Sequence, residues 1–267
     1  MTVPIVVCGA AGRMGRAIVR LVHENPETHL HGAVESPGNP TVGSDAGILA
    51  GVGELGVAIG DDYAAVATPQ SVALDFTAPA ASVAHLRIAA DCGSGIAIGT
   101  TGLSAAQRAE LEQLATKTRT VFAANMSVGV NVLLKLVRVA AETLGESFDP
   151  EIVEMHHRNK VDAPSGTALA LGRAVAAGSG RDFDETAVLA REGMVGARTD
   201  AEIGIMTLRG GNVVGDHTVI FAGLGERVEL THRAQNRDCL ARGAVRAGIW
   251  LAGRAPGLYG MADVLGI

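Results

Sequence analysis

The residues best suited to acid–base chemistry gather in one short stretch, residues 154–167, which reads EMHHRNKVDAPSGT. His156 and His157 are adjacent, and Lys160 follows four residues after the first histidine. An imidazole titrates near pH ~6.5, so it can give or take a proton close to neutral pH. A lysine adds a positive charge or a second transferable proton. This combination suits proton transfer to a substrate on which negative charge is present or develops.

The elements around this stretch form a strand, a basic loop and the start of a helix. Residues 150–155 are predicted to form the strand, and Pro164-Ser165-Gly166-Thr167 opens an apolar helical run over 166–177. The first N–H groups of a helix have no partner within the helix and favour an anion. We therefore expect a carboxylate-bearing substrate beside the proton donor.

Three other interpretations of this stretch are less favoured. A His-His pair can bind a metal, but no carboxylate or cysteine stands at ligand spacing, so no metal site is predicted. Ser165 lacks a G-x-S-x-G context, and a serine at this position is typical of a helix cap rather than a nucleophile. Asp162 is expected to be a hydrogen-bond acceptor that fixes the loop, not a base.

A second candidate site lies at the N-terminus. A strand over residues 3–8 runs into G-A-A-G-R-M-G, then a helical run, a strand over 30–34 and Glu35, twenty residues after the last glycine of the run. This order predicts a dinucleotide site, although the G-x-G-x-x-G form is absent. The glycines admit the pyrophosphate, and the acid accepts from the adenosine ribose. The residues expected to bind the cofactor here are Gly9, Ala10, Ala11, Gly12, Arg13, Met14 and Glu35.

Strands and helices continue to alternate after this motif. Strands are predicted over residues 96–98 and 121–123. Helices are predicted to start at Pro79 and at Ser104, whose partner Gln107 completes a capping box. Residues 36–60 are expected to form a surface loop. The alternation predicts an α/β fold with a Rossmann-like, mostly parallel sheet and a ligand at its carboxyl edge.

The C-terminal half has a different pattern. A helix is predicted over 128–145, and β-rich segments over 203–209, 217–222 and 227–233 suggest an open mixed sheet in an α+β domain. One short helix layer would not cover both faces of such a sheet, so burial in an oligomer is expected. A last helix is predicted over 238–252.

The length, net charge and cysteine content of the chain argue against several classes of protein. The chain has 267 residues and a net charge of −6, which argues against a nucleic-acid partner. Cys8, Cys92 and Cys239 are far apart, and neither a signal peptide nor an apolar run of ~18 residues is present. A cytoplasmic protein with no membrane partner is expected.

The 154–167 stretch resembles the E-x-H-H-x-x-K-x-D-A-P-S-G-T signature of the 4-hydroxy-tetrahydrodipicolinate (dihydrodipicolinate) reductases, without a gap. The resemblance implies reduction of 4-hydroxy-tetrahydrodipicolinate to tetrahydrodipicolinate by NADH and/or NADPH, in lysine and diaminopimelate biosynthesis. It implies that His156 is the acid and that Lys160 supplies positive charge or the proton itself. It further implies that His157, Gly166 and Thr167 hold the small dicarboxylate substrate.

The same resemblance adds two cofactor-binding segments, which alone would be interpreted as ordinary turns. They comprise Gly99, Thr100 and Thr101, and Ala124, Asn125, Met126 and Ser127. Residues 74–77 also resemble a strand end of this reductase family. The family commonly has an aromatic residue where Met126 stands, and the methionine is expected to cover the nicotinamide. His217 and His232, isolated in the C-terminal half, are expected to be structural.

The family's plan also sets the expected organisation. A dinucleotide-binding domain comprises residues 1–127 and 237–267, and a substrate-binding and oligomerisation domain comprises 128–236, within a homotetramer. Glu35 disfavours a 2′-phosphate, and Ser36 stands where several relatives have arginine. With Arg13 and Arg16 nearby, NADH with some NADPH tolerance is expected.

Two rival functions fit parts of the sequence. Another two-domain NAD(P)-dependent dehydrogenase, acting on an amino acid or a sugar, would keep residues 1–127 but would not need the whole 154–167 motif. A non-catalytic nucleotide sensor would bind the cofactor yet tolerate loss of His156 and Lys160.

Overall fold

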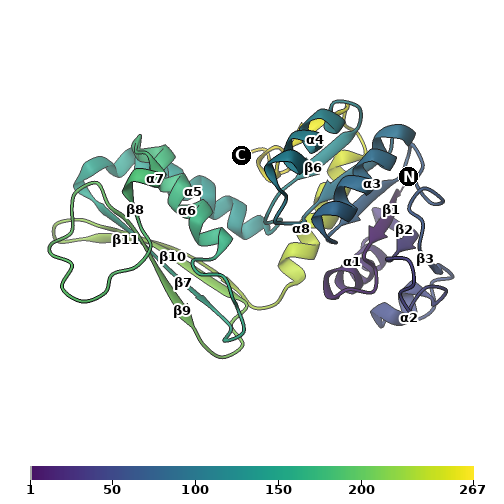
Figure 1. The fold of residues 1–267 in the computed structure, drawn as a ribbon, viewed down its shortest axis with the longest axis horizontal. Helices are drawn as coiled ribbons and strands as arrows, with labels where there is room; N and C mark the ends of the chain where they lie inside the picture. The colour runs from purple at the N-terminus through teal and green to yellow at the C-terminus, as the bar shows by residue number, and fades with distance from the viewer. Residues whose placement is uncertain (1) are drawn as a thin grey trace. The chain divides into compact units, whose positions relative to one another are not determined.

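The computed structural model describes residues 2–267, which divide into two compact units (Figure 1). Unit 1 comprises residues 2–128 and 238–266, and unit 2 comprises residues 129–237 together with Ile267. The first unit is therefore discontinuous, because α8 (Asp238–Leu251) returns to it after the second unit is complete.

Unit 1 is built on a seven-stranded sheet in the order β12-β6-β5-β4-β1-β2-β3, and every neighbouring pair in it is parallel. Apart from β12, this is the strand order of dinucleotide-binding sheets, and it confirms the predicted Rossmann-like fold. The strands are β1 (Val3–Cys8), β2 (Thr28–Val34), β3 (Ile59–Gly60), β4 (Val72–Asp75), β5 (Gly95–Ile98), β6 (Arg119–Phe122) and β12 (Gly257–Tyr259).

Helices bury both faces of this sheet. Along β1, Ile5 and Val7 pack in one apolar cluster, while Val6 and Cys8 pack in another. The first cluster includes residues of α1 and α8, and the second includes residues of α3 and α4. Burial on both sides explains why β1 reads as a continuous apolar run. The helices of unit 1 are α1 (Arg13–Glu24), α2 (Ala46–Ala50), α3 (Pro79–Cys92), α4 (Ala105–Ala115), α8 and α9 (Met261–Leu265).

Local signals predicted the helix starts well. Pro79 occupies the first turn of α3, and Ser104 and Gln107 form the expected capping box at α4. The expected surface loop over 36–60 is wrong in part, because it contains α2 and β3. The carboxylate of Asp45 organises that segment, because it accepts hydrogen bonds from the backbone N–H groups of Gly47, Ile48, Leu55 and Val57.

Unit 2 contains an open five-stranded sheet in the order β11-β10-β7-β9-β8. The β7–β9 and β9–β8 pairs are parallel and the β7–β10 and β10–β11 pairs antiparallel, so the predicted mixed sheet is confirmed. The strands are β7 (Asp149–His156), β8 (Ala187–Val188), β9 (Ile203–Arg209), β10 (Gly215–Ala222) and β11 (Arg227–Ala234).

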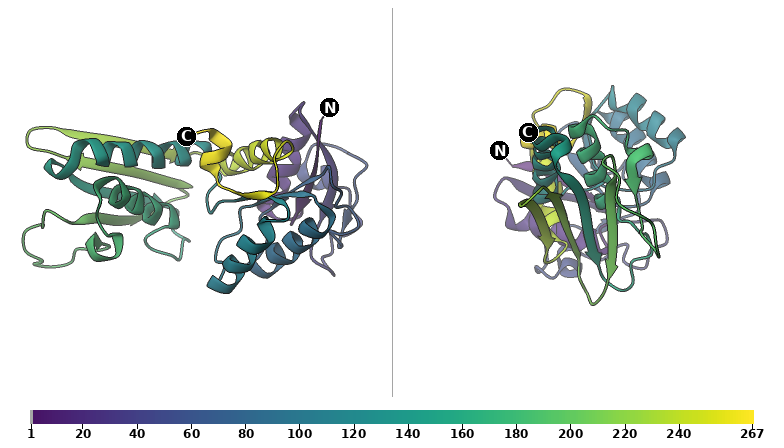
Figure 2. Two further views of the ribbon diagram at one scale, coloured as in Figure 1. Left: turned by 90° about the horizontal axis from the view of Figure 1, so that it is seen from above. Right: turned by 90° about the vertical axis from the view of Figure 1, so that its left-hand side faces the viewer.

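In the part of the chain that the structure describes, helices cover one face of this sheet (Figure 2). Residues of α5 (Val128–Leu144) and α6 (Gly166–Ser179) pack on Ile152, Val219 and Phe221, with the shorter α7 (Phe183–Thr186) beside them. Burial alternates along β7, so Glu154 and His156 point to the same covered face as Ile152. Within residues 2–267, no helix has both the length and the apolar character needed to cross a membrane.

Candidate active site

His156 ends β7 as a mostly buried side chain in unit 2. Its Nδ1 lies 2.6 Å from Oε2 of Glu154, and only about a tenth of the side chain is exposed. Burial lowers the pKa of His156, the Glu154 carboxylate opposes that effect, and the positive charges of Lys160 and Arg209 add to it. A protonated imidazole at this position therefore releases its proton more readily than a free one.

Glu154 is completely buried and accepts hydrogen bonds from three residues outside its own strand. Arg209, the last residue of β9, donates to both carboxylate oxygens, at 2.8 and 3.0 Å. Thr207 donates its hydroxyl at 3.2 Å, and the backbone N–H of Ser165 donates at 3.0 Å. No role for Glu154 or Arg209 was predicted from the sequence.

Lys160 is fixed in the loop between β7 and α6. Its Nζ donates to the two carboxylate oxygens of Asp162 at 2.7 and 2.8 Å, and a fifth of its side chain is exposed. Asp162 is thus the loop-fixing acceptor that the sequence suggested, and its backbone carbonyl also accepts from Arg209. The positive charge of the Lys160 ammonium group lowers the pKa of His156.

The N-terminus of α6 comes directly after this loop. Ser165 is the N-cap, and its hydroxyl accepts from the N–H of Ala168 at 3.2 Å, as expected for a cap rather than a nucleophile. A side chain at Gly166 would meet open space, so the first turn is sterically open at this residue. Nearby in sequence, Nδ1 of His157 is buried and has no hydrogen-bond partner among the described residues.

His217 is a member of the site that the sequence did not place there. It stacks edge-on against His156, with ring centroids 5.1 Å apart, and its Nε2 lies 3.2 Å from the Ser165 hydroxyl. Burial lowers the pKa of His217 to about 4, with a smaller contribution from the charge of His156, so the ring is neutral near pH 7. Gly215 has no side chain and so leaves room for the His156 ring, because a Cβ there would lie 3.0 Å from Nε2 of His156.

The glycine turn after β1 in unit 1 has the geometry of a nucleotide loop. Gly9 has φ +74°, and Gly15 packs so closely that a Cβ would lie 2.1 Å from the Gly9 carbonyl oxygen. Gly12 is the N-cap of α1 and has no side chain that could accept a hydrogen bond. The N–H groups of the first turn, including those of Arg13 and Met14, therefore have no capping side chain as acceptor. An anion could be bound by these groups.

A cavity of about 420 Å³ opens beside this turn. Gly9, Gly12 and Glu35, all predicted from sequence, line it together with residues that come after β4. It therefore lies where strand order reverses between β1 and β4, the usual ligand position in such sheets. The Glu35 carboxylate accepts the N–H of Ala11 at 3.1 Å and that of Ser36 at 2.9 Å. Phe76 and Thr77, from the strand end over 74–77, also line the cavity. So do residues that the sequence did not predict, among them Pro37, Asp61, Ala81 and His85.

The two segments added by resemblance come after β5 and β6, at the same carboxyl edge. Gly99 is required sterically, because a Cβ would lie 2.1 Å from the Phe76 ring. Thr101 and Ala124 are exposed, whereas the hydroxyl of Thr100 is buried and bonded to Ser82 at 2.7 Å.

Met126 requires a correction. Its side chain is completely buried in the apolar core of unit 1, so it cannot cover a bound nicotinamide as expected. Its backbone is held by α8, since a Cβ at Gly243 would lie 1.7 Å from the Met126 carbonyl oxygen. The Met126 side chain packs in the same apolar cluster as residues of α8.

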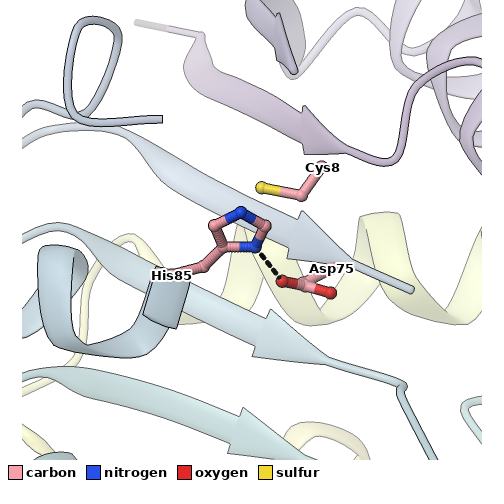
Figure 3. Close-up of side chains that lie close together, drawn as sticks. All are labelled: Cys8, Asp75 and His85. Carbon is pink, nitrogen blue, oxygen red and sulfur yellow. Dashed lines mark hydrogen bonds and ion pairs between the residues drawn. The ribbon is translucent and has the colours of Figure 1, made fainter. Parts of the chain in front are cut away.

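Cys8, Asp75 and His85 form the one cluster of possible metal ligands found among the described residues (Figure 3). Nδ1 of His85 lies 2.6 Å from Oδ2 of Asp75, and the other carboxylate oxygen accepts from Thr77 and Ser82. Burial raises the pKa of the Cys8 thiol well above its usual value. These hydrogen bonds account for the cluster, and a neutral, buried thiol is a poor metal ligand.

Comparison with known proteins agrees with both units. Sequence models described as "Dihydrodipicolinate reductase, N-terminus" and "Dihydrodipicolinate reductase, C-terminus" match residues 3–126 and 129–265. A 4-hydroxy-tetrahydrodipicolinate reductase of Alkalilimnicola ehrlichii is 53% identical over 267 residues, covering all of both chains. One from Pelobacter propionicus is 52% identical over 265 residues, or 99% of each chain.

A solved structure shares the fold. The dipicolinate-bound dihydrodipicolinate reductase of Paenisporosarcina sp. TG-14 superposes with a TM-score of 0.76 at 23% identity, covering 98% of this chain and 99% of that one. Sequence models that match almost the whole chain, and relatives more than 50% identical to it over their full length, lead to one conclusion. The chain belongs to the dihydrodipicolinate reductase family.

Proposed function

We propose that the chain reduces 4-hydroxy-tetrahydrodipicolinate to tetrahydrodipicolinate with NADH or NADPH, as a step of lysine and diaminopimelate biosynthesis. The observation that carries the proposal is the arrangement of His156 and Lys160 ahead of the open N-terminus of α6, in a chain that belongs to this family. An acid, a cation and an anion site are the groups that such a reduction requires of a protein.

A bound nicotinamide supplies a hydride, and the remaining chemistry falls to the chain. The substrate gains one hydride and one proton and loses its hydroxyl group as water, while the cofactor is oxidised. Protonated His156 donates through Nε2, because its Nδ1 is engaged with Glu154. Lys160 stabilises the negative charge that develops before the proton arrives, or delivers the proton itself.

The two carboxylates of the substrate need separate partners. The N–H groups of Gly166 and Thr167 belong to the first turn of α6 and suit one carboxylate. His157 suits the second, since its Nδ1 is unpaired among the described residues and can donate. These assignments give unit 2 the role of a substrate domain.

Unit 1 is proposed to bind the cofactor. The pyrophosphate would lie over Gly9, Ala10, Ala11, Gly12, Arg13 and Met14, where the first turn of α1 has no side-chain cap. Glu35 would accept from the adenosine ribose, which favours NADH, with NADPH tolerated near Arg13 and Arg16. The segments proposed to border the nicotinamide are Gly99, Thr100 and Thr101, and the backbone of Ala124, Asn125, Met126 and Ser127.

The remaining features of the proposal concern the assembly. The sheet face opposite α5 and α6 carries half-buried Val153 and Met155, and we propose that it joins four copies into a homotetramer. A biosynthetic enzyme of this kind is expected in the cytoplasm, with a small dicarboxylate as its partner and neither nucleic acid nor membrane.

A coupled assay tests the function. Aspartate semialdehyde, pyruvate and the upstream synthase generate the substrate, and oxidation of NADH and of NADPH is followed separately. We expect kcat to fall by about 10²- to 10⁴-fold in His156→Ala and in Lys160→Ala, the range that general acid catalysis supplies. Arg173→Ala, at an exposed cation of the same unit, should stay within about twofold. Absence of cofactor oxidation by a wild-type protein that binds NADH would refute the proposal.

A further inference from the structure

We infer that Glu154 is a positioning residue, which fixes the ring of His156 for proton transfer and, through the same carboxylate, fixes the N-terminus of α6 where substrate binds. The inference rests on the proposed function for its catalytic meaning. The contacts that carry it belong to unit 2 alone.

Both oxygens of Glu154 are fully engaged. Oε2 faces Nδ1 of His156 at 2.6 Å and accepts from Arg209 at 2.8 Å. Oε1 accepts from Arg209, from the N–H of Ser165 and from the Thr207 hydroxyl, at 3.0, 3.0 and 3.2 Å. A carboxylate that is 0% exposed and has this many donors is held in one orientation.

This environment keeps Glu154 ionised. Burial by itself would raise the pKa of Glu154, but the hydrogen bonds from Arg209, His156 and Ser165 outweigh burial and hold the pKa below its ordinary value. An ionised carboxylate can only accept, so Nδ1 of His156 must carry a hydrogen in every protonation state. The labile proton of His156 is then always on Nε2.

The second effect of Glu154 is on the loop that separates the acid from α6. The Ser165 N–H that Glu154 accepts lies eleven residues further along the chain, at the N-cap of that helix. Arg209, paired with the same carboxylate, also donates to the backbone carbonyl of Asp162 at 2.6 Å. One ion pair thus sets the distance between the proton donor and the proposed carboxylate site.

A purely structural ion pair is the competing explanation, and the titration of His156 distinguishes the two. Removing the charge of Glu154 removes the contribution that raises the pKa of His156 and leaves those of burial, Lys160 and Arg209, which lower it. The pKa of His156 in Glu154→Gln should therefore fall below that of wild type. A structural role alone predicts no such shift in a folded variant.

The decisive measurement is ¹⁵N NMR of His156 in the full-length protein, in wild type and in Glu154→Gln, with the signal assigned from His156→Asn. In wild type we expect the neutral ring to carry its hydrogen on Nδ1. In Glu154→Gln we expect a lower pKa, and the activity limb that falls as pH rises should move to lower pH. We also expect kcat to fall by at least about tenfold.

Glu151→Gln is the matched control. Glu151 lies on the same strand, is held by Arg191 and Arg198 at 2.7–3.1 Å, and touches none of the proposed site. The Glu151→Gln variant loses a comparable ion pair, but the pKa of His156 and the pH profile of activity should stay as in wild type. If Glu154→Gln does not fold, Glu154→Asp keeps the charge, and should keep the pKa of His156 near that of wild type while kcat falls, because the shorter chain cannot reach both His156 and Ser165.

The outcomes separate this inference from the proposed function. A wild-type neutral ring that carries its hydrogen on Nε2 overturns the inference, and so does an unchanged pKa of His156 in folded Glu154→Gln, whatever the activity. Wild-type kcat in Glu154→Asp overturns it as well. A shifted pKa in a protein whose wild type consumes no cofactor supports the positioning role and refutes the proposed reaction.

Discussion

At the scale of single residues, the site in unit 2 combines groups whose ionisation is set by burial and by near neighbours. His156 and Glu154 are coupled through one short hydrogen bond, and His217 is stacked beside them as a neutral ring. Among residues 2–267, His217 has no carboxylate as a hydrogen-bond partner, and burial is the largest effect on its pKa.

The depressed pKa of His217 predicts a pH dependence of stability. The ring has a pKa of about 4 in the folded chain and ~6.5 when unfolded, so the unfolded chain binds the extra proton between these values. The free energy of unfolding should therefore drop as pH falls from about 6.5 to 4, by an amount of the order of 3 kcal/mol at most. Urea denaturation at a series of pH values measures this, and the slope should weaken in His217→Gln. His29→Gln, at an exposed histidine, is the control, and equal slopes in wild type and His217→Gln would contradict the prediction.

Cofactor preference is also decided by single side chains. Ser36 is exposed at the cavity beside Glu35, and an arginine there could bind a 2′-phosphate through charged hydrogen bonds. We expect Ser36→Arg to raise the NADPH-to-NADH ratio of kcat/KM by about tenfold, the effect of ~1.4 kcal/mol. Ser36→Gln adds length without charge and should leave the ratio near that of wild type. An unchanged ratio in the arginine variant would place the adenosine ribose elsewhere.

At the scale of elements, two helices begin with a serine cap but lie in different surroundings. Ser165 opens α6 beside the proposed carboxylate site, whereas Ser104 opens α4 in unit 1. Each hydroxyl accepts one backbone N–H of the first turn at 3.2 Å, so a difference in KM between their alanine variants reports on the site.

Alanine at either serine removes one cap and should cost about 1 kcal/mol of stability. Ser165→Ala also frees the first turn of α6 and removes the partner of His217, so KM for the dicarboxylate should rise several-fold. Ser104→Ala should leave KM unchanged. Thermal denaturation and steady-state kinetics of both variants make the comparison, and equal KM values would argue against an anion site at α6.

At the scale of the whole molecule, the sheet of unit 2 has one face covered by helices and one that carries half-buried apolar side chains. Sedimentation equilibrium should give a mass roughly four times the 27.2 kDa of one chain. Val153→Glu, in the central strand on the open face, should lower that mass. Leu136→Glu, at an exposed position of α5, should not. A monomeric wild type would refute the proposed assembly.

The elements and the candidate chemistry of this chain could be predicted from its sequence. Apolar runs, a glycine turn, Pro79 and the Ser104–Gln107 pair specify local structure through short-range interactions, and the 154–167 motif is contiguous. The short α2 and β3 escaped prediction because a single aspartate organises them.

Which distant residues meet at the site depends on the tertiary structure. Pairing of β7 with β9 places Arg209 opposite His156, and pairing with β10 places His217 opposite Glu154. Strand register depends on long-range packing, and a shift of one residue would move these side chains to the other face of the sheet. Long-range packing also explains why Met126, which the family resemblance placed against the nicotinamide, is buried beneath α8.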